Sequence, residues 1–238
     1  MTALRVDCHL HTALSGDAVT TIDELAERVE QERLDVVFIT DHNVTAAAIA
    51  AAERGIGCRI IVGEEIRTSD GDIIGLFLTE RVPYVLPLAD AIALVRAQGG
   101  LVSLPHPFDP GRSSIGGAMA EQLCAAGLAD VVEVFNAKIS DPGLNRQAAE
   151  LAARYELPGV AGSDAHDPDG IGAAYLEMPD FDGPASFLES LASAEIFGEH
   201  RPHAIRYPRP RLPRTTLSPS AASTAPIPSS NAKTPADM

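Results

Sequence analysis

Short apolar runs that alternate with longer helix-like segments are the feature that most limits the folds open to this chain. The runs are rich in Val, Ile and Leu, as in ALRVDCH, DVVFIT, CRIIVGEE, LVSLPH and DVVEVFN. Such short apolar runs are typical of buried strands. Strands that alternate with helices are typical of a parallel sheet covered by helices. The order therefore predicts an α/β fold, either a closed barrel or an open doubly wound sheet.

Helix signals separate these runs. Helices are predicted at residues 22–33, from about residue 45, and at residues 87–98, 118–126, 144–155 and 184–194. Thr21 and Glu24 have the capping-box spacing at the start of the first helix. Between two strand-like runs, Ser69-Asp70-Gly71 predicts a turn.

The composition changes near residue 204, where RYPRPRLPRTTLSPSAASTAPIPSS begins a stretch without apolar periodicity. We therefore predict a folded domain over residues 1–200 and a basic, Pro- and Ser-rich disordered tail over residues 201–238. A solvated tail is the simpler interpretation, although its basic start also suits an acidic surface. Residues 1–200 contain 12 basic and 32 acidic residues, a net charge of −20, which disfavours binding to long nucleic acids.

The sequence predicts neither a membrane-spanning segment nor an export signal. No uncharged apolar run is long enough for a membrane span, and charged residues from Arg5 onward interrupt any apolar signal segment. We therefore expect a cytoplasmic protein. Cys8, Cys58 and Cys124 lack CxxC spacing, so we expect reduced thiols rather than a disulfide framework.

Histidine and carboxylate side chains, the types that commonly bind metals, lie where the apolar runs end. These are His9, His11, His42, Glu65, His106, Asp164 and His166, with Asp17 shortly after the first run. In a parallel barrel all strand C-termini emerge on one face. A single histidine at a strand end is more often a hydrogen-bonded loop residue. Here six segments carry such polar residues, the sixth being the run that contains Glu133 and ends at Asn136. A histidine–carboxylate cluster of this size predicts two or three divalent metal ions of the Zn, Mn or Fe class.

The motifs DCHLHT, TDHN, GEEI, LPHPFD, EVFN and GSDAH follow one another in this order. Together they resemble the PHP family, named for polymerase and histidinol phosphatase. The resemblance covers about residues 4–194. It implies a distorted (β/α)7 TIM-like barrel with a di- or trinuclear metal site at the C-terminal ends of the strands, and phosphoesterase activity.

The resemblance also implies a ligand set. One metal would take His9, His11, Glu65 and Asp164, a second would share Glu65 and take His106, and a third would take Asp17, His42 and His166. Glu65 rather than Glu64 matches the family motif, so Glu64 is expected to face packing or solvent.

Two positions depart from the family pattern around the second metal. Asp72 and Asn136 stand where many members have histidine. Asp72 is either a weaker ligand or a turn residue, and the turn is preferred. Glu133 faces either the metals or an internal polar contact. Asp41 either orients a ligand or the loop, or caps the following turn.

The expected chemistry is hydrolysis of a phosphate monoester of a small metabolite or nucleotide through a metal-bound hydroxide. Arg112 and Lys138 follow strand ends in a body that has few basic residues. We expect both to contact the phosphate of a small phosphorylated substrate. Ordinary surface charge is the alternative for each of them.

Two other functions stay open. One is a nuclease that trims short oligonucleotide ends, and the other is a non-catalytic, metal-stabilised sensor domain. GxGxxG, P-loop and GxSxG motifs do not occur, which argues against dinucleotide binding and serine hydrolysis. Phe108 alone supplies an aromatic ring to the loops expected to surround the site, so no base-stacking platform is predicted. The sequence predicts no particular oligomeric state.

Overall fold

A computed structural model of the chain describes residues 3–139 and 141–201. The predicted tail lies outside these residues except for Arg201, whose backbone N donates to Ala137 O at 2.7 Å. The strands are β1 (Leu4–Leu10), β2 (Val36–Ile39), β3 (Arg59–Arg67), β4 (Asp72–Leu76), β5 (Leu101–Leu104), β6 (Val131–Asn136), β7 (Gly159–Gly162), β8 (Ala174–Met178) and β9 (Glu195–Gly198).

The helices lie close to their predicted positions. They are η1 (Ala13–Ser15) and η2 (Pro168–Gly170), both short 3-10 helices, and α1 (Ile22–Glu32), α2 (Ala46–Arg54), α3 (Leu88–Ala97), α4 (Gly117–Ala125), α5 (Pro142–Arg154) and α6 (Pro184–Leu191). The capping box of α1 is confirmed, because Glu24 N donates to Thr21 Oγ1 while Thr21 N donates to the Glu24 carboxylate. Among the described helices, none combines the length and the apolar character that crossing a bilayer requires.

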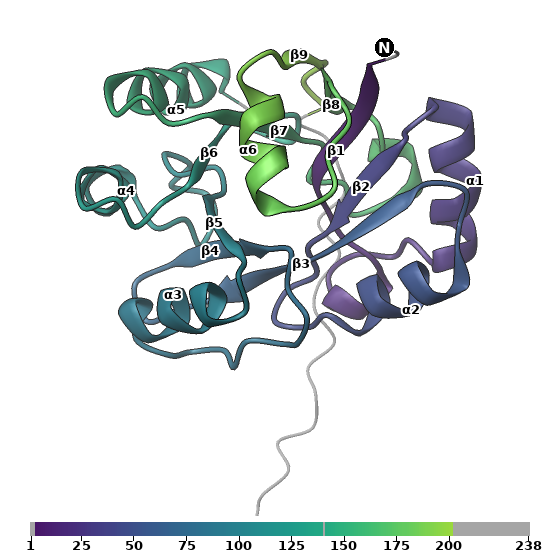
Figure 1. The fold of residues 1–238 in the computed structure, drawn as a ribbon, viewed down its shortest axis with the longest axis horizontal. Coiled ribbons are helices and arrows are strands. Elements are labelled where there is room, and N and C mark those ends of the chain that lie inside the picture. The colour runs from purple at the N-terminus through teal and green to yellow at the C-terminus, as the bar shows by residue number, and fades with distance from the viewer. Residues whose placement is uncertain (1–2, 140, 202–238) are drawn as a thin grey trace, which may run out of the picture.

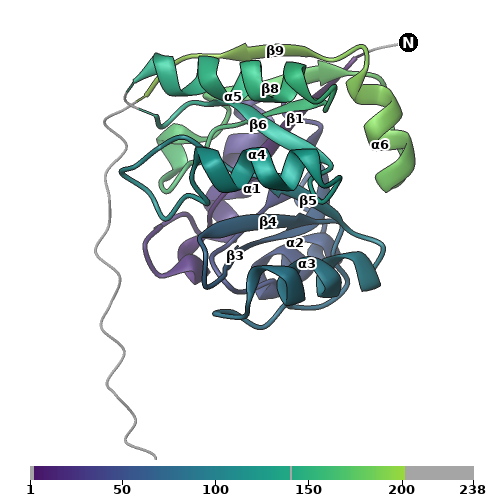
Figure 2. The same ribbon diagram turned by 90° about the vertical axis from the view of Figure 1, so that its left-hand side faces the viewer.

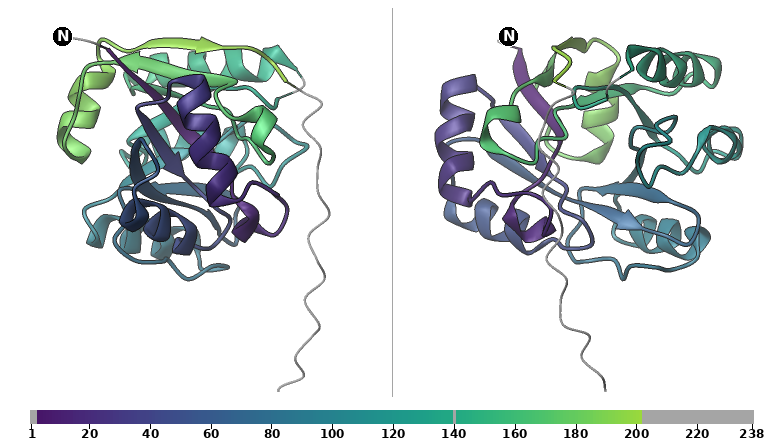
Figure 3. Two further views of the ribbon diagram at one scale, coloured as in Figure 1. Left: turned by 90° about the vertical axis from the view of Figure 1, so that its right-hand side faces the viewer. Right: turned by 180° about the vertical axis from the view of Figure 1, so that it is seen from behind.

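The strands form one sheet in the order β7-β6-β5-β4-β3-β2-β1-β8-β9, with helices packed around its outside (Figures 1 and 2). The sheet curves until β1 meets the segment after β7, where Asp164 N donates to His9 O at 2.7 Å and His11 N donates to Ala165 O at 2.9 Å. Figure 3 shows the same curvature from two further sides. The predicted distorted α/β barrel is therefore confirmed as a nearly closed barrel-shaped sheet.

The expectation of a parallel sheet is wrong for three strands. β4 runs antiparallel to both β3 and β5, and β8 and β9 run antiparallel to their neighbours. A parallel pair needs a long crossover connection, and the short turn between Arg67 and Asp72 leaves no room for one. β9 follows α6 and was not predicted, because its four residues are exposed and form no buried apolar run.

The reversal of β4 decides where Asp72 lies. In an antiparallel strand the first residue sits at the end of the barrel where the parallel strands finish. The preferred interpretation of Asp72 as a turn residue is therefore wrong, since it begins β4 and pairs with Arg67 across the strands. Its side chain is buried and reaches the same end as the candidate site.

An aromatic cluster fills the opposite end of the barrel. It consists of Phe38 from β2, Phe77 after β4, Phe181 after β8 and Phe187 from α6, with ring centroids 5.0–6.5 Å apart. Edge and tilted contacts of this kind add to the stabilisation from apolar burial. Helix α6 thus closes the N-terminal end of the barrel.

Candidate metal centre

A cavity of about 360 Å³ lies at the C-terminal ends of the parallel strands. It is lined by Asp17, His42, Glu65, Arg67, Asp72, His106, Gly111, Arg112, Ser113, Lys138 and His166. His9, His11 and Asp164 lie against these residues and are almost completely buried. The structure thus brings together all of the site residues predicted from the sequence.

Four of these side chains converge on one another. The Nε2 atoms of His9 and His11 are 3.1 Å apart, and they lie 3.4 Å and 3.3 Å from Glu65 Oε2. Asp164 Oδ1 is 3.3 Å from His11 Nε2 and 3.8 Å from His9 Nε2. Each imidazole nitrogen therefore lies within 3.8 Å of both carboxylates, and His9, His11 and Asp164 have donor atoms within 4.8 Å of one another.

This group of four fits a divalent metal ion. Ligands held about 2.0–2.2 Å from a tetrahedral metal lie roughly 3.3–3.5 Å from one another, which matches most of these separations. Asp164 Oδ1 is buried and has no hydrogen-bond partner within the described chain. Mixed imidazole and carboxylate donors suit Zn, Mn or Fe.

Glu133 orients the His9 ring through its Nδ1 atom. Its Oε1 lies 2.8 Å from His9 Nδ1, while its Oε2 accepts from His106 N at 2.7 Å and from Asn136 Nδ2 at 3.0 Å. Of the two roles left open for Glu133, the structure supports the internal polar contact. A carboxylate on Nδ1 leaves the Nε2 lone pair available to a metal.

His11 is oriented in the same manner by a hydroxyl group. Ser15 Oγ donates to Asp41 Oδ1 at 2.8 Å, so it acts as the acceptor for His11 Nδ1 at 2.9 Å. Asp41 also accepts from the backbone N and the hydroxyl of Thr12. Asp41 therefore holds the loop that carries His11 rather than capping its own following turn. Ser15 could not be recognised from the sequence, because a hydroxyl in a loop carries no periodic signal.

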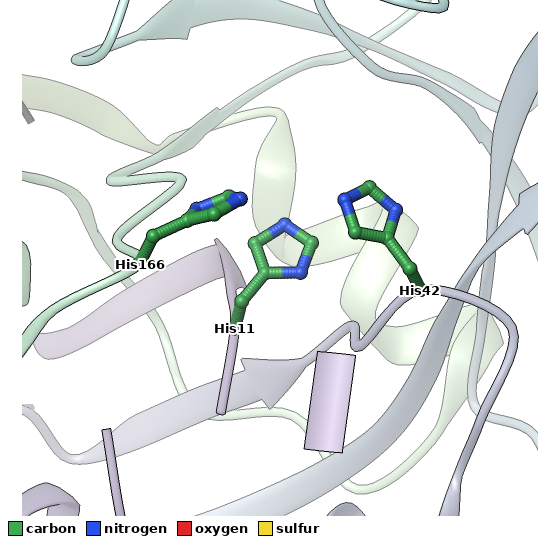
Figure 4. Close-up of side chains that lie close together, drawn as sticks. All are labelled: His11, His42 and His166. Carbon is green, nitrogen blue, oxygen red and sulfur yellow. The ribbon is translucent and has the colours of Figure 1, made fainter. Parts of the chain in front are cut away.

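A second group contains three histidine rings that face one another (Figure 4). The ring centroid of His11 lies 4.6 Å from that of His42 and 4.3 Å from that of His166. Asp17 approaches the Nε2 atoms of His42 and His166 at 3.4 Å and 3.9 Å. Burial and the neighbouring His11 lower the pKa of His166 to about 2, so this ring is a neutral donor. This group also suits a divalent metal.

Fewer free donors surround His106. Its Nε2 lies 3.3 Å from Glu65 Oε1, and Glu65 thereby contacts four histidines. Asp72 is near, but its carboxylate binds the Arg67 guanidinium at Nε and Nη2. Asn136 directs its amide to Glu133 and to Asp164 Oδ2. Of the two positions that depart from the family pattern, Asp72 also lies close enough to His42 and Glu65 to share a metal with them, whereas the Asn136 amide is engaged by two carboxylates.

Two basic side chains reach Asp164 from the loops. Arg112 Nη1 donates to Asp164 Oδ2, and Lys138 Nζ lies 3.9 Å from Asp164 Oδ1. Burial lowers the pKa of Lys138. Burial alone would raise the pKa of Asp164, but Arg112 and Lys138 hold it well below its usual value. Both predicted phosphate contacts therefore lie at the site.

The backbone bends sharply at this end of the barrel. His106 and Asp164 have φ values of 29° and 49°, in a region that non-glycine residues seldom adopt. Gly162 precedes this bend, and a Cβ there would lie 2.3 Å from His9 Cβ. The close approach of β7 to β1 thus requires glycine at this position.

Comparison with known proteins gives concordant matches. The PHP domain profile matches residues 7–109, and the PHP-associated profile, PHP_C, matches residues 142–196. An uncharacterized protein of Methanocaldococcus jannaschii is 36% identical over 197 residues, covering 79% of each chain. A protein of Syntrophotalea carbinolica named "Probable phosphatase" is 29% identical over 193 residues, covering 68% of this chain and 80% of that protein.

The solved structures include a similar fold. A two-domain protein of Bacteroides vulgatus, described as containing a predicted PHP-like metal-dependent phosphoesterase, superposes with a TM-score of 0.65 at 18% identity. The match covers 83% of this chain and 65% of that protein, so the present chain spans about two thirds of its length. At this identity the likeness concerns the fold.

Proposed function

Because this chain belongs to the PHP family, we propose that its candidate metal centre hydrolyses a phosphate monoester of a small metabolite or nucleotide. One observation carries the proposal. The group formed by His9, His11, Glu65 and Asp164 adjoins two cations at one cavity, the partly buried Arg112 and the buried Lys138. Metal ligands alone would suit a scaffold, whereas cations beside them suit a phosphate ester.

The proposed metal ligands follow the groups described above. One metal would be held by His9, His11, Glu65 and Asp164, another would be held by Asp17, His42 and His166, and His106 would act with Glu65. When bound, divalent metals would lower the pKa of water to provide the nucleophile and would neutralise phosphoryl oxygens. Glu133 and Ser15 hold the rings of His9 and His11, so these donors need little rearrangement.

Arg112 and Lys138 have separate roles in this proposal. The Arg112 guanidinium binds two phosphoryl oxygens in its planar fork. Lys138 is only 5% exposed along its side chain, so its ammonium has a fixed position and balances charge in the transition state. Neither residue acts as a proton carrier.

The test is phosphate release from mononucleotides, sugar phosphates and amino-alcohol phosphates with added Mn or Zn. Wild-type protein is expected to release phosphate, and His9→Ala is expected to lose roughly 1,000-fold or more. Arg96→Gln is the matched control, because Arg96 pairs with Asp130 on the surface.

Metal content should be measured alongside the activity. Metal-loaded wild-type protein that releases nucleotides only from oligonucleotide ends would indicate a nuclease. Metal-loaded protein that hydrolyses no ester would indicate a sensor domain and would contradict the proposal.

A further inference from the structure

Arg67 is a basic residue of the cavity that neither the sequence motifs nor the proposed chemistry uses. It ends β3 two residues after Glu65 and lines the same cavity. Side chains two positions apart in a strand share a face, so Arg67 lies above Glu65 toward the opening. Its position makes it a candidate contact for the part of a substrate beyond the phosphate.

The guanidinium of Arg67 is fixed on one edge. Nε and Nη2 bind the two carboxylate oxygens of Asp72, and Nη2 also donates to Ser113 Oγ at 2.6 Å. The Ser113 carbonyl in turn accepts from Asp72 N at 2.7 Å. A strand and a loop therefore hold the plane of the guanidinium before any ligand binds.

The other edge of the guanidinium is available. Within the described residues, Nη1 of Arg67 has no hydrogen-bond partner, and 37% of the side chain is exposed. A planar donor with a fixed orientation is well suited to a carboxylate or phosphate oxygen. Preorganisation of this kind reduces the ordering cost of binding.

The distribution of charge supports a second anion position. Only 12 basic residues occur in residues 1–200, yet three of them line this one cavity. Arg112 and Lys138 both approach Asp164, whereas Arg67 is held at Asp72. The cavity thus has cations held at two different carboxylates, Asp164 and Asp72, which fits a ligand with two anionic groups.

The size and lining of the cavity limit the rest of the ligand. About 360 Å³ is near the lower end of the range for ligand pockets, roughly 300–1,000 Å³. Its lining residues include no Phe, Tyr or Trp. Base recognition commonly uses aromatic stacking, so the lining favours a compact, non-aromatic molecule.

We infer that Arg67 is a specificity-determining residue that binds the leaving group, and that the preferred ester is a small, non-aromatic phosphate monoester with a second anionic group. The inference rests on the proposed function and narrows its substrate class. The second group is a carboxylate or a phosphate, which share the oxygen chemistry that Nη1 would bind.

The test compares kcat/KM for matched esters. Glycerol 3-phosphate has a neutral leaving group, 3-phosphoglycerate has a carboxylate, and glycerol 1,3-bisphosphate has a phosphate. Wild-type protein is expected to favour at least one of the anionic esters by roughly 10- to 100-fold, and the larger ratio identifies the group. In Arg67→Gln the ratio should fall to near one, with Arg67→Lys intermediate. Arg96→Gln is the control that should keep the wild-type ratio.

Binding of the same three esters to chelator-treated protein, measured by calorimetry, separates this inference from the proposed function. An Arg67-dependent preference in binding supports the inference even if no ester is hydrolysed. Hydrolysis without preference for either anionic ester would overturn the inference and leave the proposed function intact. A preference that survives in Arg67→Gln, with metal content and folding unchanged, would also overturn it.

Discussion

The two ends of the barrel are built from the same strands and differ completely in chemistry. Along β2 and its extension, Phe38 packs among phenylalanine rings at one end, and His42 faces a carboxylate at the other. The N-terminal end is apolar and closed by α6. The C-terminal end buries histidines, acids and cations against one another. The aromatic end lowers the free energy of the fold, whereas the polar end requires charged groups to leave water.

This difference indicates a division of labour. Apolar packing in the aromatic cluster does not depend on bound ions. It can therefore stabilise the arrangement of the strands before a metal binds to the histidine and carboxylate donors. At the polar end, Glu133 accepts a hydrogen bond from His9 and Ser15 accepts one from His11 while donating to Asp41, and these bonds keep the metal-donor atoms in place. Substitutions at the two ends should therefore alter different measurements.

The largest effect is expected from His11→Ala. His11 is a proposed ligand of the first metal, and its ring also contacts His42 and His166 of the second group, so its loss should lower phosphate release by roughly 1,000-fold or more and reduce the metal content. The measurement pairs steady-state kinetics with elemental analysis. Full metal content and wild-type kinetics in this variant would remove His11 from the proposed ligand set.

At the other end, Phe187→Ala should lower the free energy of unfolding by about 3–5 kcal/mol, because it leaves a cavity among packed rings. Metal content per folded molecule should stay unchanged. Chemical denaturation and elemental analysis measure the two quantities. Phe197→Ala is the control, since Phe197 is exposed and should cost much less. A loss of metal affinity in folded Phe187→Ala would contradict the division between the two ends.

A smaller effect is expected from Glu133→Gln. The amide keeps the shape of the side chain but weakens its hold on His9 Nδ1, so metal affinity should fall by roughly 10- to 100-fold. Competition with a chelating dye measures this change. Glu121→Gln is a surface control, because Glu121 pairs with Arg154 away from the site. Equal affinities in wild type and Glu133→Gln would leave Glu133 with a structural role only.

The smallest effect concerns Glu64, which is buried next to Glu65 but accepts a hydrogen bond from Val82 N on the other face of β3. Burial raises the pKa of Glu64 to about 7. The protonated form therefore stabilises the folded state below the unfolded pKa, and this contribution is lost as the pH rises through 7. Between pH 6 and pH 8, wild-type protein should lose about 1 kcal/mol that Glu64→Gln does not lose. The free energy of unfolding of both proteins is measured by denaturation at each pH in this range. Parallel curves of this free energy against pH would show that the burial of Glu64 has no such effect.

Much of the polar end follows from the sequence, because the ends of parallel strands must meet. His9, His11, Glu65, Asp164 and their partners each end a recognisable run, so their convergence could be predicted. Asp72 could not be placed, because its position depends on the reversed direction of β4. That direction is set by a turn too short for a crossover.

The supporting contacts are the harder part to foresee. Ser15 and Arg67 gain their roles from segments that are distant in sequence, through Asp41 and Ser113 respectively. Glu133 lies in a run that predicts a strand, but strand periodicity alone could not predict which residue Glu133 contacts. The exposed strand β9 lacks the buried apolar pattern that makes strands recognisable.

The hydrogen bonds between His9 and Asp164 and between His11 and Ala165 have a kinetic consequence. They join segments about 155 positions apart in the chain. The group of four metal donors is therefore assembled by contacts between residues that are very distant in sequence. Contacts of this kind form slowly, since a long loop must close before they stabilise anything. During synthesis, a growing chain would complete strands β1 to β3 long before residue 164 leaves the ribosome. Tight metal binding would therefore begin only after the barrel has closed.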